Sequence, residues 1–371
     1  MSMFSDIDAR HMASALKLAE QGRYTTSPNP NVGCVLVAEN GDIISEGFHL
    51  KAGGPHAEAE ALNKANNRAR GATAYVTLEP CSHHGRTPPC SDALIKAGVR
   101  RVVVAMQDPN PKVAGNGIKK MRDAGIQVDI GLMETQATAL NKGFFKRQLQ
   151  GLPRVTLKMA ASLDAKTALS NGVSQWITGT AARRDVQEHR ARSCAIVSGS
   201  GTVLADNPAL TIRADELPGS VQQQYPGDIR QPLRVILDGR NQLHPALKVF
   251  ADNRVLVVNR QPNPLLTQAG IEQWQAPTSA DKIDLHAVLT CLAQRQINDV
   301  WLEVGSRLGG AFVQANLVDE LIVYLAPKLM GSAGFSLLQL PEFKSMDQVP
   351  EMRFSDTRMV GEDLKITAHF V

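Results

Sequence analysis

One imidazole and two thiols, each directly preceded by a proline, constrain the fold of this chain more than any other feature. They belong to His56, Cys81 and Cys90. A histidine nitrogen and two cysteine sulfurs are ligands that zinc prefers, and a zinc site with three protein ligands keeps its fourth position open. We therefore expect a fold that brings three separate segments of the chain to one point.

A carboxylate accompanies these three ligands. Glu58 lies two residues after His56, and residues so spaced on a regular helix point in different directions, so both can face one site only where a helix begins. Pro55 favours such a start. Zinc brings the pKa of a bound water toward about 7, and Glu58 would move the proton of that water to the substrate.

This pattern is typical of zinc-dependent base deaminases, except that eight residues separate Cys81 from Cys90 where two are usual. Other interpretations stay open. The set could be a closed structural zinc site with His83 or His84 as the fourth ligand, although such a site needs no adjacent glutamate. Glu58 alone could be an ordinary carboxylate at a helix N-terminus. The combination at this spacing favours the catalytic interpretation.

Composition narrows the class of protein. The chain has 371 residues, of which 43% are hydrophobic, 20% charged and 5% aromatic, with a net charge of +4. These values describe a globular protein long enough for two domains. Aromatic residues do not alternate with basic runs, so we expect no nucleic-acid partner. We also expect a cytoplasmic protein with no membrane partner, because the sequence shows no long apolar run and no signal-peptide layout.

Helical and strand patterns alternate in two blocks. The first block predicts helices at 7–21, 56–67, 91–97, 117–124 and 134–147, and strands at 31–38, 42–48, 73–78, 101–105 and 126–130. Asn40-Gly41 predicts a tight hairpin turn between the first two strands. The second block predicts strands at 155–159, 194–198, 233–237, 254–258, 299–304, 320–325 and 363–370, and helices at 180–192, 284–295 and 309–316. Residues 222–230 and 261–280 have the composition of polar loops. We expect two α/β domains, 1–147 and 148–371, joined by a linker in 148–154.

Several motifs distributed over both blocks are recognisable. They occupy residues 28–33, 55–58, 77–90, 107–111, 140–144, 161–164, 174–178, 202–208 and 320–324. With these motifs the chain resembles the bacterial bifunctional deaminase–reductases of riboflavin biosynthesis, in which the long segment between the two cysteines is the usual form.

The resemblance implies a fold and two reactions. Residues 1–147 would form a cytidine-deaminase-like three-layer domain that uses Zn²⁺ to remove the 2-amino group of 2,5-diamino-6-(5-phosphoribosylamino)pyrimidin-4-one. Residues 148–371 would form a dihydrofolate-reductase-like α/β domain that uses NADPH to reduce the ribosyl chain of the product to ribityl. The resemblance also implies a homo-oligomer, a dimer or tetramer. The alternative is an RNA or nucleoside base deaminase with a C-terminal binding module.

The resemblance further implies roles for single residues. It places NADPH against Ala160, Trp176, Thr202, Asp206, Gly305, Ser306, Arg307, Leu308, Gly309, Gly310 and Ala311. It places the substrates against Asn29, Ser174, Arg190, Leu210, Arg213 and Glu303.

The residue types themselves suit some of these roles. Residues 305–311 follow an apolar strand and open a helix, where backbone N–H groups can receive a phosphate, although they do not match G-x-G-x-x-G. Arg190 and Arg213 could each offer paired donors to a phosphate. Lys158, in a strand with apolar neighbours, could protonate the ribose, with Asp206 as the other candidate acid. Asn29 could contact a base or sugar edge, or only form a turn.

Overall fold

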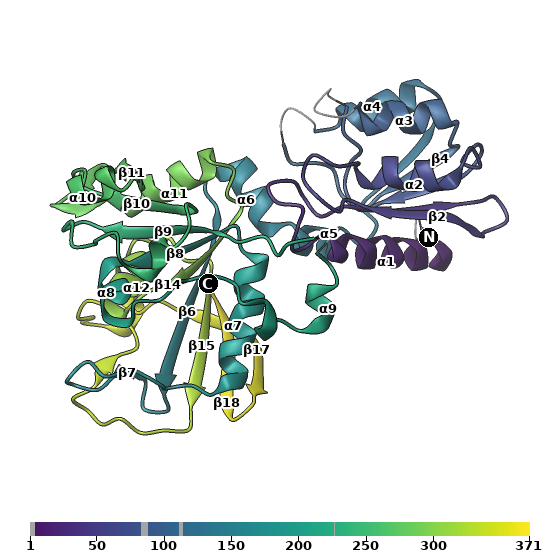
Figure 1. Ribbon diagram of the computed structural model, residues 1–371. Helices are drawn as coiled ribbons and strands as arrows, with labels where there is room; N and C mark the ends of the chain where they lie inside the picture. Colours follow the sequence, from purple (N-terminus) through teal and green to yellow (C-terminus); the bar gives the residue numbers. More distant parts are fainter. Residues whose placement is uncertain (1–3, 83–87, 111–113, 226) are drawn as a thin grey trace. The chain divides into compact units, whose positions relative to one another are not determined.

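The structure is a computed structural model that describes residues 4–371 except 83–87, 111–113 and 226 (Figure 1). The chain divides into two compact units, Met1–Gly151 and Leu152–Val371. The division lies after Gly151 because helix α6 (Lys142–Gln150) continues past residue 147, where the sequence places the domain boundary.

The first unit contains a five-stranded sheet. Its strands lie in the order β2-β1-β3-β4-β5, and they are β1 (Gly33–Val37), β2 (Ile43–Phe48), β3 (Thr73–Val76), β4 (Arg101–Val104) and β5 (Gln127–Ile130). β1 pairs antiparallel with β2 and β3, whereas β3, β4 and β5 are parallel. Its other helices are α1 (Asp6–Gln21), α2 (Ala57–Ala65), α3 (Cys90–Ala97), α4 (Asn116–Asp123) and α5 (Glu134–Leu140).

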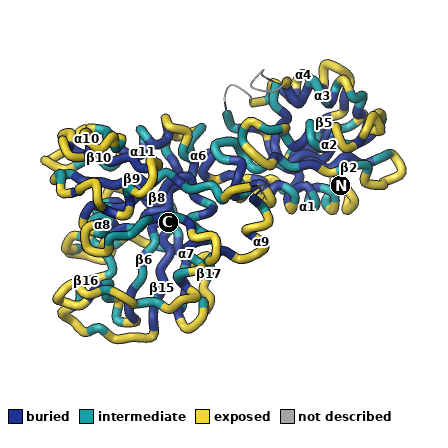
Figure 2. The backbone as a smooth tube through the Cα atoms, viewed as in Figure 1, coloured by how far each residue is buried: buried dark blue, intermediate teal, exposed yellow. Residues whose placement is uncertain are grey.

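Alternating side chains on the strands create one core on each face of this sheet. On β1, Leu36 packs with the helices α2, α3 and α4, whereas its neighbours Val35 and Val37 pack with α1, α5 and α6. Figure 2 shows the buried strands between the more exposed helices and loops. The unit therefore has the three-layer arrangement that was expected.

The second unit contains a nine-stranded sheet in the order β11-β10-β9-β8-β14-β6-β15-β18-β17. Its strands are β6 (Arg154–Ser162), β8 (Ala195–Gly199), β9 (Leu233–Asp238), β10 (Val255–Asn259), β11 (Glu272–Gln275), β14 (Asp299–Glu303), β15 (Glu320–Ala326), β17 (Met352–Val360) and β18 (Asp363–Phe370). The pairs from β11 to β15 are parallel, and β15, β18 and β17 pair antiparallel.

Helices cover both faces of this larger sheet as well. α11 (Leu285–Gln294) and α12 (Ser306–Gln314) pack on one hydrophobic core, and α7 (Thr180–Arg192), α8 (Ser200–Asp206) and α10 (Pro264–Gln268) pack on the other. The short helix α9 (Gly219–Gln222) and two small sheets, β7 (Lys166–Ala168) with β16 (Phe335–Ser336) and β12 (Thr278–Ser279) with β13 (Lys282–Ile283), lie in the connections.

Some elements differ from the sequence prediction. The single helix predicted at 134–147 is two helices that meet at Asn141, because the Asn141 side chain bonds to the backbone N–H and C=O of Asn31 at 2.7 and 2.9 Å. Residues 261–280, expected to be a loop, contain α10 and the edge strand β11. α12 begins at Ser306, three residues before the predicted start at 309.

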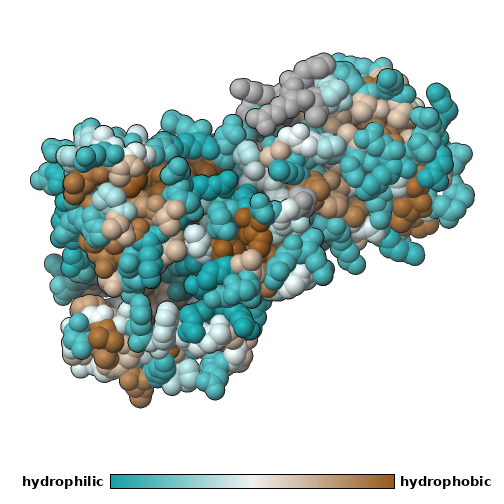
Figure 3. Space-filling model, viewed as in Figure 1, coloured by the Kyte–Doolittle hydropathy of each residue, from teal (hydrophilic) through white to brown (hydrophobic). Residues whose placement is uncertain are grey.

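Much of the surface in Figure 3 is hydrophilic, with hydrophobic patches between. Among the helices of the described ranges 4–82, 88–110, 114–225 and 227–371, none combines the length and the apolar character that crossing a bilayer requires.

Candidate active sites

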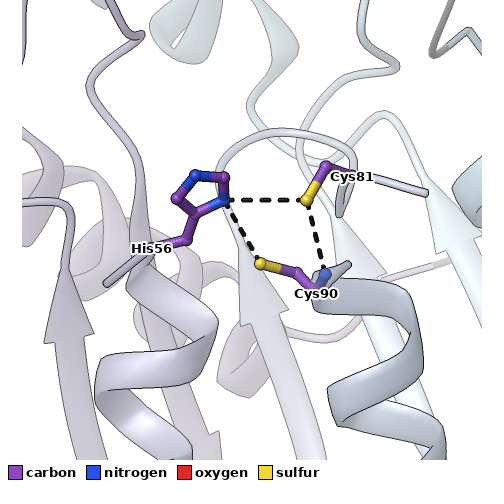
Figure 4. A group of neighbouring side chains, drawn as sticks. All are labelled: His56, Cys81 and Cys90. Carbon is purple, nitrogen blue, oxygen red and sulfur yellow. Dashed lines mark hydrogen bonds between the residues drawn. The ribbon is translucent and has the colours of Figure 1, made fainter. Parts of the chain in front are cut away.

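The three predicted metal ligands meet in the first unit (Figure 4). His56 Nδ1 lies 3.6 Å from Cys81 Sγ and 3.4 Å from Cys90 Sγ, and the three ligand atoms all lie within 4.8 Å of one another. Around a tetrahedral zinc ion with Zn–N of about 2.0 Å and Zn–S of about 2.3 Å, neighbouring ligand atoms lie roughly 3.5 Å apart. The residues present therefore fit Zn²⁺ in both donor type and spacing.

Local structure turns these ligands toward one another. His56 is the N-cap of α2 and Cys90 the first residue of α3, so two helix N-termini lie at the site. The backbone N–H of Cys90 donates to Cys81 Sγ at 3.3 Å. Hydrogen bonding with Cys90 lowers the pKa of the Cys81 thiol to about 4, against the effect of burial. The pair therefore favours one thiolate, on Cys81, because hydrogen bonding with Cys81 and burial raise the pKa of the Cys90 thiol.

Glu58 lies in the first turn of α2 beside the ligands. Its side chain is buried, with 3% of the residue exposed. Burial, with the nearby charge of Cys81, raises the pKa of Glu58 to about 7. A carboxyl group with this pKa can both accept and release a proton at neutral pH.

Asn29 is held near the ligands by a residue that the sequence analysis did not single out. His49 is 2% exposed, and its Nδ1 lies 2.8 Å from the carbonyl oxygen of Pro55, while its Nε2 lies 3.0 Å from Asn29 Nδ2. Because a carbonyl only accepts, His49 carries its proton on Nδ1 and accepts the Asn29 amide on Nε2. The His49 ring also packs edge-on against His56, with 5.2 Å between centroids. His83 and His84, the alternative fourth ligands, lie outside the described residues.

In the second unit, two helices begin side by side at the carboxyl ends of neighbouring parallel strands. β8 continues into α8, which carries Thr202 and Asp206, and β14 continues through Gly305 into α12. The two turns lie close together. A Cβ added to Gly199, at the end of β8, would lie 3.0 Å from the side chain of Leu308 in α12. Paired helix N-termini in this position can receive the phosphates of a dinucleotide.

The segment 305–311 is open only at its beginning. Gly305 and Arg307 are exposed, and Ser306 and Leu308 are half-buried. Gly309 and Gly310 are buried, and a Cβ on Gly310 would lie 2.1 Å from the carbonyl oxygen of Gln339. These two glycines allow α12 to pack closely against the segment that contains Gln339, and Ala311 is half-buried beside them.

Hydrogen bonds attach the segment around Trp176 to Asp206 and to Lys328. Gln175 Nε2 donates to Asp206 Oδ1 at 2.9 Å, and Lys328 Nζ donates to the carbonyl oxygen of Trp176 at 2.7 Å. Trp176 is 65% exposed, and the Arg183 guanidinium lies 4.7 Å from its ring centroid. Its exposed ring can therefore stack on a flat ligand. Ser174 is half-buried in the same segment, and Ala160 is half-buried toward the end of β6.

Lys158, Arg190 and Glu303 form one charged group. Lys158 on β6 is the register partner of Glu303 on β14. Arg190 donates from Nε and Nη2 to the two Glu303 oxygens at 2.6 and 2.8 Å, and from Nη1 to the Thr211 carbonyl oxygen at 2.9 Å. Burial alone would raise the pKa of Glu303, but Arg190, Lys158 and the indole N–H of Trp301 hold it at about 2. Burial lowers the pKa of Lys158.

The two arginines expected to bind phosphate therefore differ. The fork of Arg190 already engages Glu303, so these two residues act as a unit. The Arg213 side chain is 52% exposed and pairs with Glu216 at 2.7 Å, which leaves it accessible to an anion. Leu210 is buried with a φ of 53°, a left-handed conformation that is uncommon for a residue other than glycine.

A metal-ligand set with an adjacent buried glutamate, followed by a mostly parallel sheet with two helix N-termini at one edge, is the arrangement of a zinc deaminase joined to a dinucleotide-binding domain. Comparison with known proteins agrees. Residues 5–106 match the family described as "Cytidine and deoxycytidylate deaminase zinc-binding region", and residues 153–366 match the "RibD C-terminal domain". The chain belongs to the RibD family of riboflavin biosynthesis proteins, bifunctional enzymes that use zinc and NADPH.

Relatives match nearly the whole length of the chain. It is 50% identical to the riboflavin biosynthesis protein RibD of Escherichia coli, covering 96% of this chain and 98% of the relative. It is 48% identical to RibD of Haemophilus influenzae, with 99% and 98% covered. The structure of Acinetobacter baumannii RibD superposes with a TM-score of 0.91 at 43% identity, covering 98% of this chain and 99% of that one. Family membership favours the deaminase interpretation of the metal site over a closed structural zinc site.

Proposed function

We propose that the first unit removes an amino group from a phosphorylated diaminopyrimidine, and that the second unit reduces the ribosyl chain of the product. A Thermotoga maritima structure with a TM-score of 0.86 and 34% identity, covering 98% of this chain and 99% of that one, is described as a diaminohydroxyphosphoribosylaminopyrimidine deaminase and 5-amino-6-(5-phosphoribosylamino)uracil reductase. The observation that carries the proposal is the convergence of His56, Cys81 and Cys90 beside the buried Glu58.

The residues of the first unit divide the chemistry among them. His56 Nδ1, Cys81 Sγ and Cys90 Sγ hold Zn²⁺, which when bound activates water as a nucleophile. The Glu58 carboxylate would take one proton from the attacking water and pass it to the ring nitrogen. It would then carry the second proton, from the new hydroxyl group, to the leaving amine, a task that its pKa of about 7 suits. His49 engages the NH₂ group of Asn29, so Asn29 would use its Oδ1 to accept a hydrogen bond from the substrate.

In the second unit, NADPH supplies the hydride when bound. The N-terminal turns of α8 and α12, with Thr202 and the segment 305–308, would hold its phosphates, and the exposed Trp176 would contact it. The Arg190–Glu303 pair orients the ribose, and the exposed Arg213 binds the substrate phosphate. Lys158 Nζ donates a proton to the ribose, because burial lowers the pKa of this ammonium.

Two separate assays test this assignment. Ammonia release from the diaminopyrimidine phosphate reports on the first unit, and NADPH oxidation with the deaminated product reports on the second. Glu58→Gln should slow ammonia release by about 10²- to 10⁴-fold and leave NADPH oxidation unchanged. Glu60→Gln is the matched control, because Glu60 lies in the same helical turn and pairs with Lys64 at 2.9 Å. Ammonia release by Glu58→Gln at the wild-type rate would contradict the role of Glu58.

We also infer a homo-oligomer, a dimer or tetramer, in the cytoplasm. β17 lies at the edge of the large sheet and exposes Phe354 and Met359, which are 70% and 61% exposed. An edge strand presents unpaired backbone groups to which a second copy can add, and Phe354 and Met359 would give apolar contacts between the charged residues of β17. Light scattering on the purified protein tests this, and Phe354→Asp should shift the mass toward that of the monomer.

A further inference from the structure

Glu79 is a buried carboxylate directly before Pro80 and Cys81, and only 4% of the residue is exposed. It receives no role in the chemistry proposed above. Burial of a carboxylate is costly unless hydrogen bonds compensate it. The contacts of Glu79 therefore indicate what this residue does.

Four backbone N–H groups donate to Glu79. Oε2 accepts from Asp108 at 3.2 Å and from Gly115 at 3.0 Å, and Oε1 accepts from Gly117 at 2.9 Å and from Ile118 at 3.2 Å. A carboxylate offers about four acceptor positions, so these donors use its capacity. The N-cap of α4, Gly115, has no side chain to bond with, and Glu79 satisfies the first-turn amides of this helix in its place.

The same contacts limit where Cys81 can lie. The backbone N–H of Glu79 donates to the carbonyl oxygen of Met106 at 3.0 Å, just beyond β4. On the other side, the backbone N–H and the hydroxyl of Ser91 donate to the carbonyl oxygen of Cys81 at 3.1 and 3.0 Å. Between these two attachments the chain has only Pro80 and Cys81 to place, and proline restricts the backbone further.

α4 also approaches Pro80 directly. A Cβ added to Gly117 would lie 2.0 Å from the carbonyl oxygen of Pro80, so only glycine permits this contact. The same helix pairs with α3, which begins with Cys90, through Lys120 and Asp92 at 2.5 Å. α4 thus supports the segments of both cysteines.

We propose that Glu79 is a positioning residue of the metal centre, which holds Cys81 in place for Zn²⁺ by fastening the Glu79–Pro80–Cys81 segment to α4. The inference rests on the proposed zinc site. Residues outside the coordination sphere that hold metal ligands in place typically change metal affinity by about 10- to 100-fold when they are removed. The substitution Glu79→Gln keeps the shape of the side chain but replaces one acceptor oxygen with an NH₂ group that faces backbone donors.

The test measures zinc affinity in the metal-free full-length protein, by titration with Zn²⁺ against a chromophoric chelator. Glu79→Gln should weaken zinc binding by about 10- to 100-fold and lower kcat for ammonia release. NADPH oxidation by the same chain should stay at the wild-type rate. With Co²⁺ in place of zinc, the visible absorption of the variant should shift, because it reports on thiolate geometry. Glu39→Gln is the control, because Glu39 is an exposed glutamate of the same unit that pairs with Arg100 at 3.4 Å.

A second variant keeps the inference open to contradiction if Glu79→Gln does not fold. Gly117→Ala pushes α4 away from Pro80 without changing charge, and it should also weaken zinc binding. Wild-type zinc affinity and cobalt spectrum in a folded Glu79→Gln protein would overturn the inference, as would loss of the folded unit in both variants. A wild-type chain that bound no zinc would contradict the proposed metal site itself.

Discussion

Replacing Arg190 with methionine tests the buried ion pair of the second unit. The side chains of Arg190 and Glu303 are only 11% and 14% exposed, and two hydrogen bonds join them. Methionine retains most of the apolar volume, so the change removes mainly charge and hydrogen bonds. Glu303 would remain buried with Lys158 as the nearby cation. Removing one partner of a buried pair costs about 3–5 kcal/mol.

Tryptophan fluorescence can measure this loss. The three tryptophans of the chain, Trp176, Trp274 and Trp301, all lie in the second unit, so their emission reports on the unfolding of that unit alone. In a unit of this size, about 1 kcal/mol shifts Tm by roughly 2–4 °C, so Arg190→Met should lower Tm by on the order of 6–20 °C.

The pH dependence separates charge from packing. The pKa of Glu303 is about 2 in the folded chain against an ordinary value of 4.5 for glutamate. Its ionisation therefore stabilises the fold above pH 4.5, and this contribution is lost as pH falls toward 2. Without Arg190, burial raises the pKa of Glu303. The stability gap between wild type and Arg190→Met should therefore be widest at neutral pH and narrow below pH 4.5. The double variant Arg190→Met/Glu303→Gln should regain part of the loss. A loss below about 1 kcal/mol at pH 7, or a double variant no more stable than the single one, would refute the reasoning.

Three further outcomes are expected. Burial opposes the ionisation of Asp8, but hydrogen bonds from Arg101 and Tyr75 hold its pKa well below the ordinary value. Asp8→Asn should therefore lower Tm, measured by circular dichroism, more at pH 7 than at pH 3. An equal loss at both pH values would contradict this. Gly310→Ala should destabilise the second unit by about 1–3 kcal/mol, because the new Cβ meets the Gln339 carbonyl oxygen and shifts α12. The same shift should raise KM for NADPH, and an unchanged KM would contradict a role of α12 in cofactor binding. A metal chelator should abolish ammonia release and leave NADPH oxidation intact, with recovery on added Zn²⁺; ammonia release that survived full removal of zinc would exclude a catalytic metal.

The metal site could be predicted because local signals determine it. Prolines mark the helix starts at which His56 and Cys90 lie, and the structure has α2 and α3 beginning there. The Asn40-Gly41 turn likewise predicted the pairing of β1 with β2, which is confirmed. In each case, residues close together in the sequence decide the local geometry.

Other parts depend on residues far apart in the sequence. Lys365 donates to Asp185 and to His189 at 2.6 and 2.7 Å, and Tyr324 also donates to Asp185. These contacts require the packing of α7 against β15 and β18, which no local pattern specifies. The break in the helix at 134–147 has the same kind of cause, since the partner of Asn141 lies near β1. The role of Glu79 was missed because its donors follow it by about thirty residues or more.

Strands β1 to β5 form one sheet, and β6 and the later long strands form another. This separation has a consequence for how cells supply the two activities. Each sheet completes its own core, yet both are made by a single pass of one ribosome. Every finished polypeptide therefore delivers one deaminating and one reducing centre. The balance between the successive steps is then fixed by the turnover rates of the two sites, and changes in expression raise or lower both together.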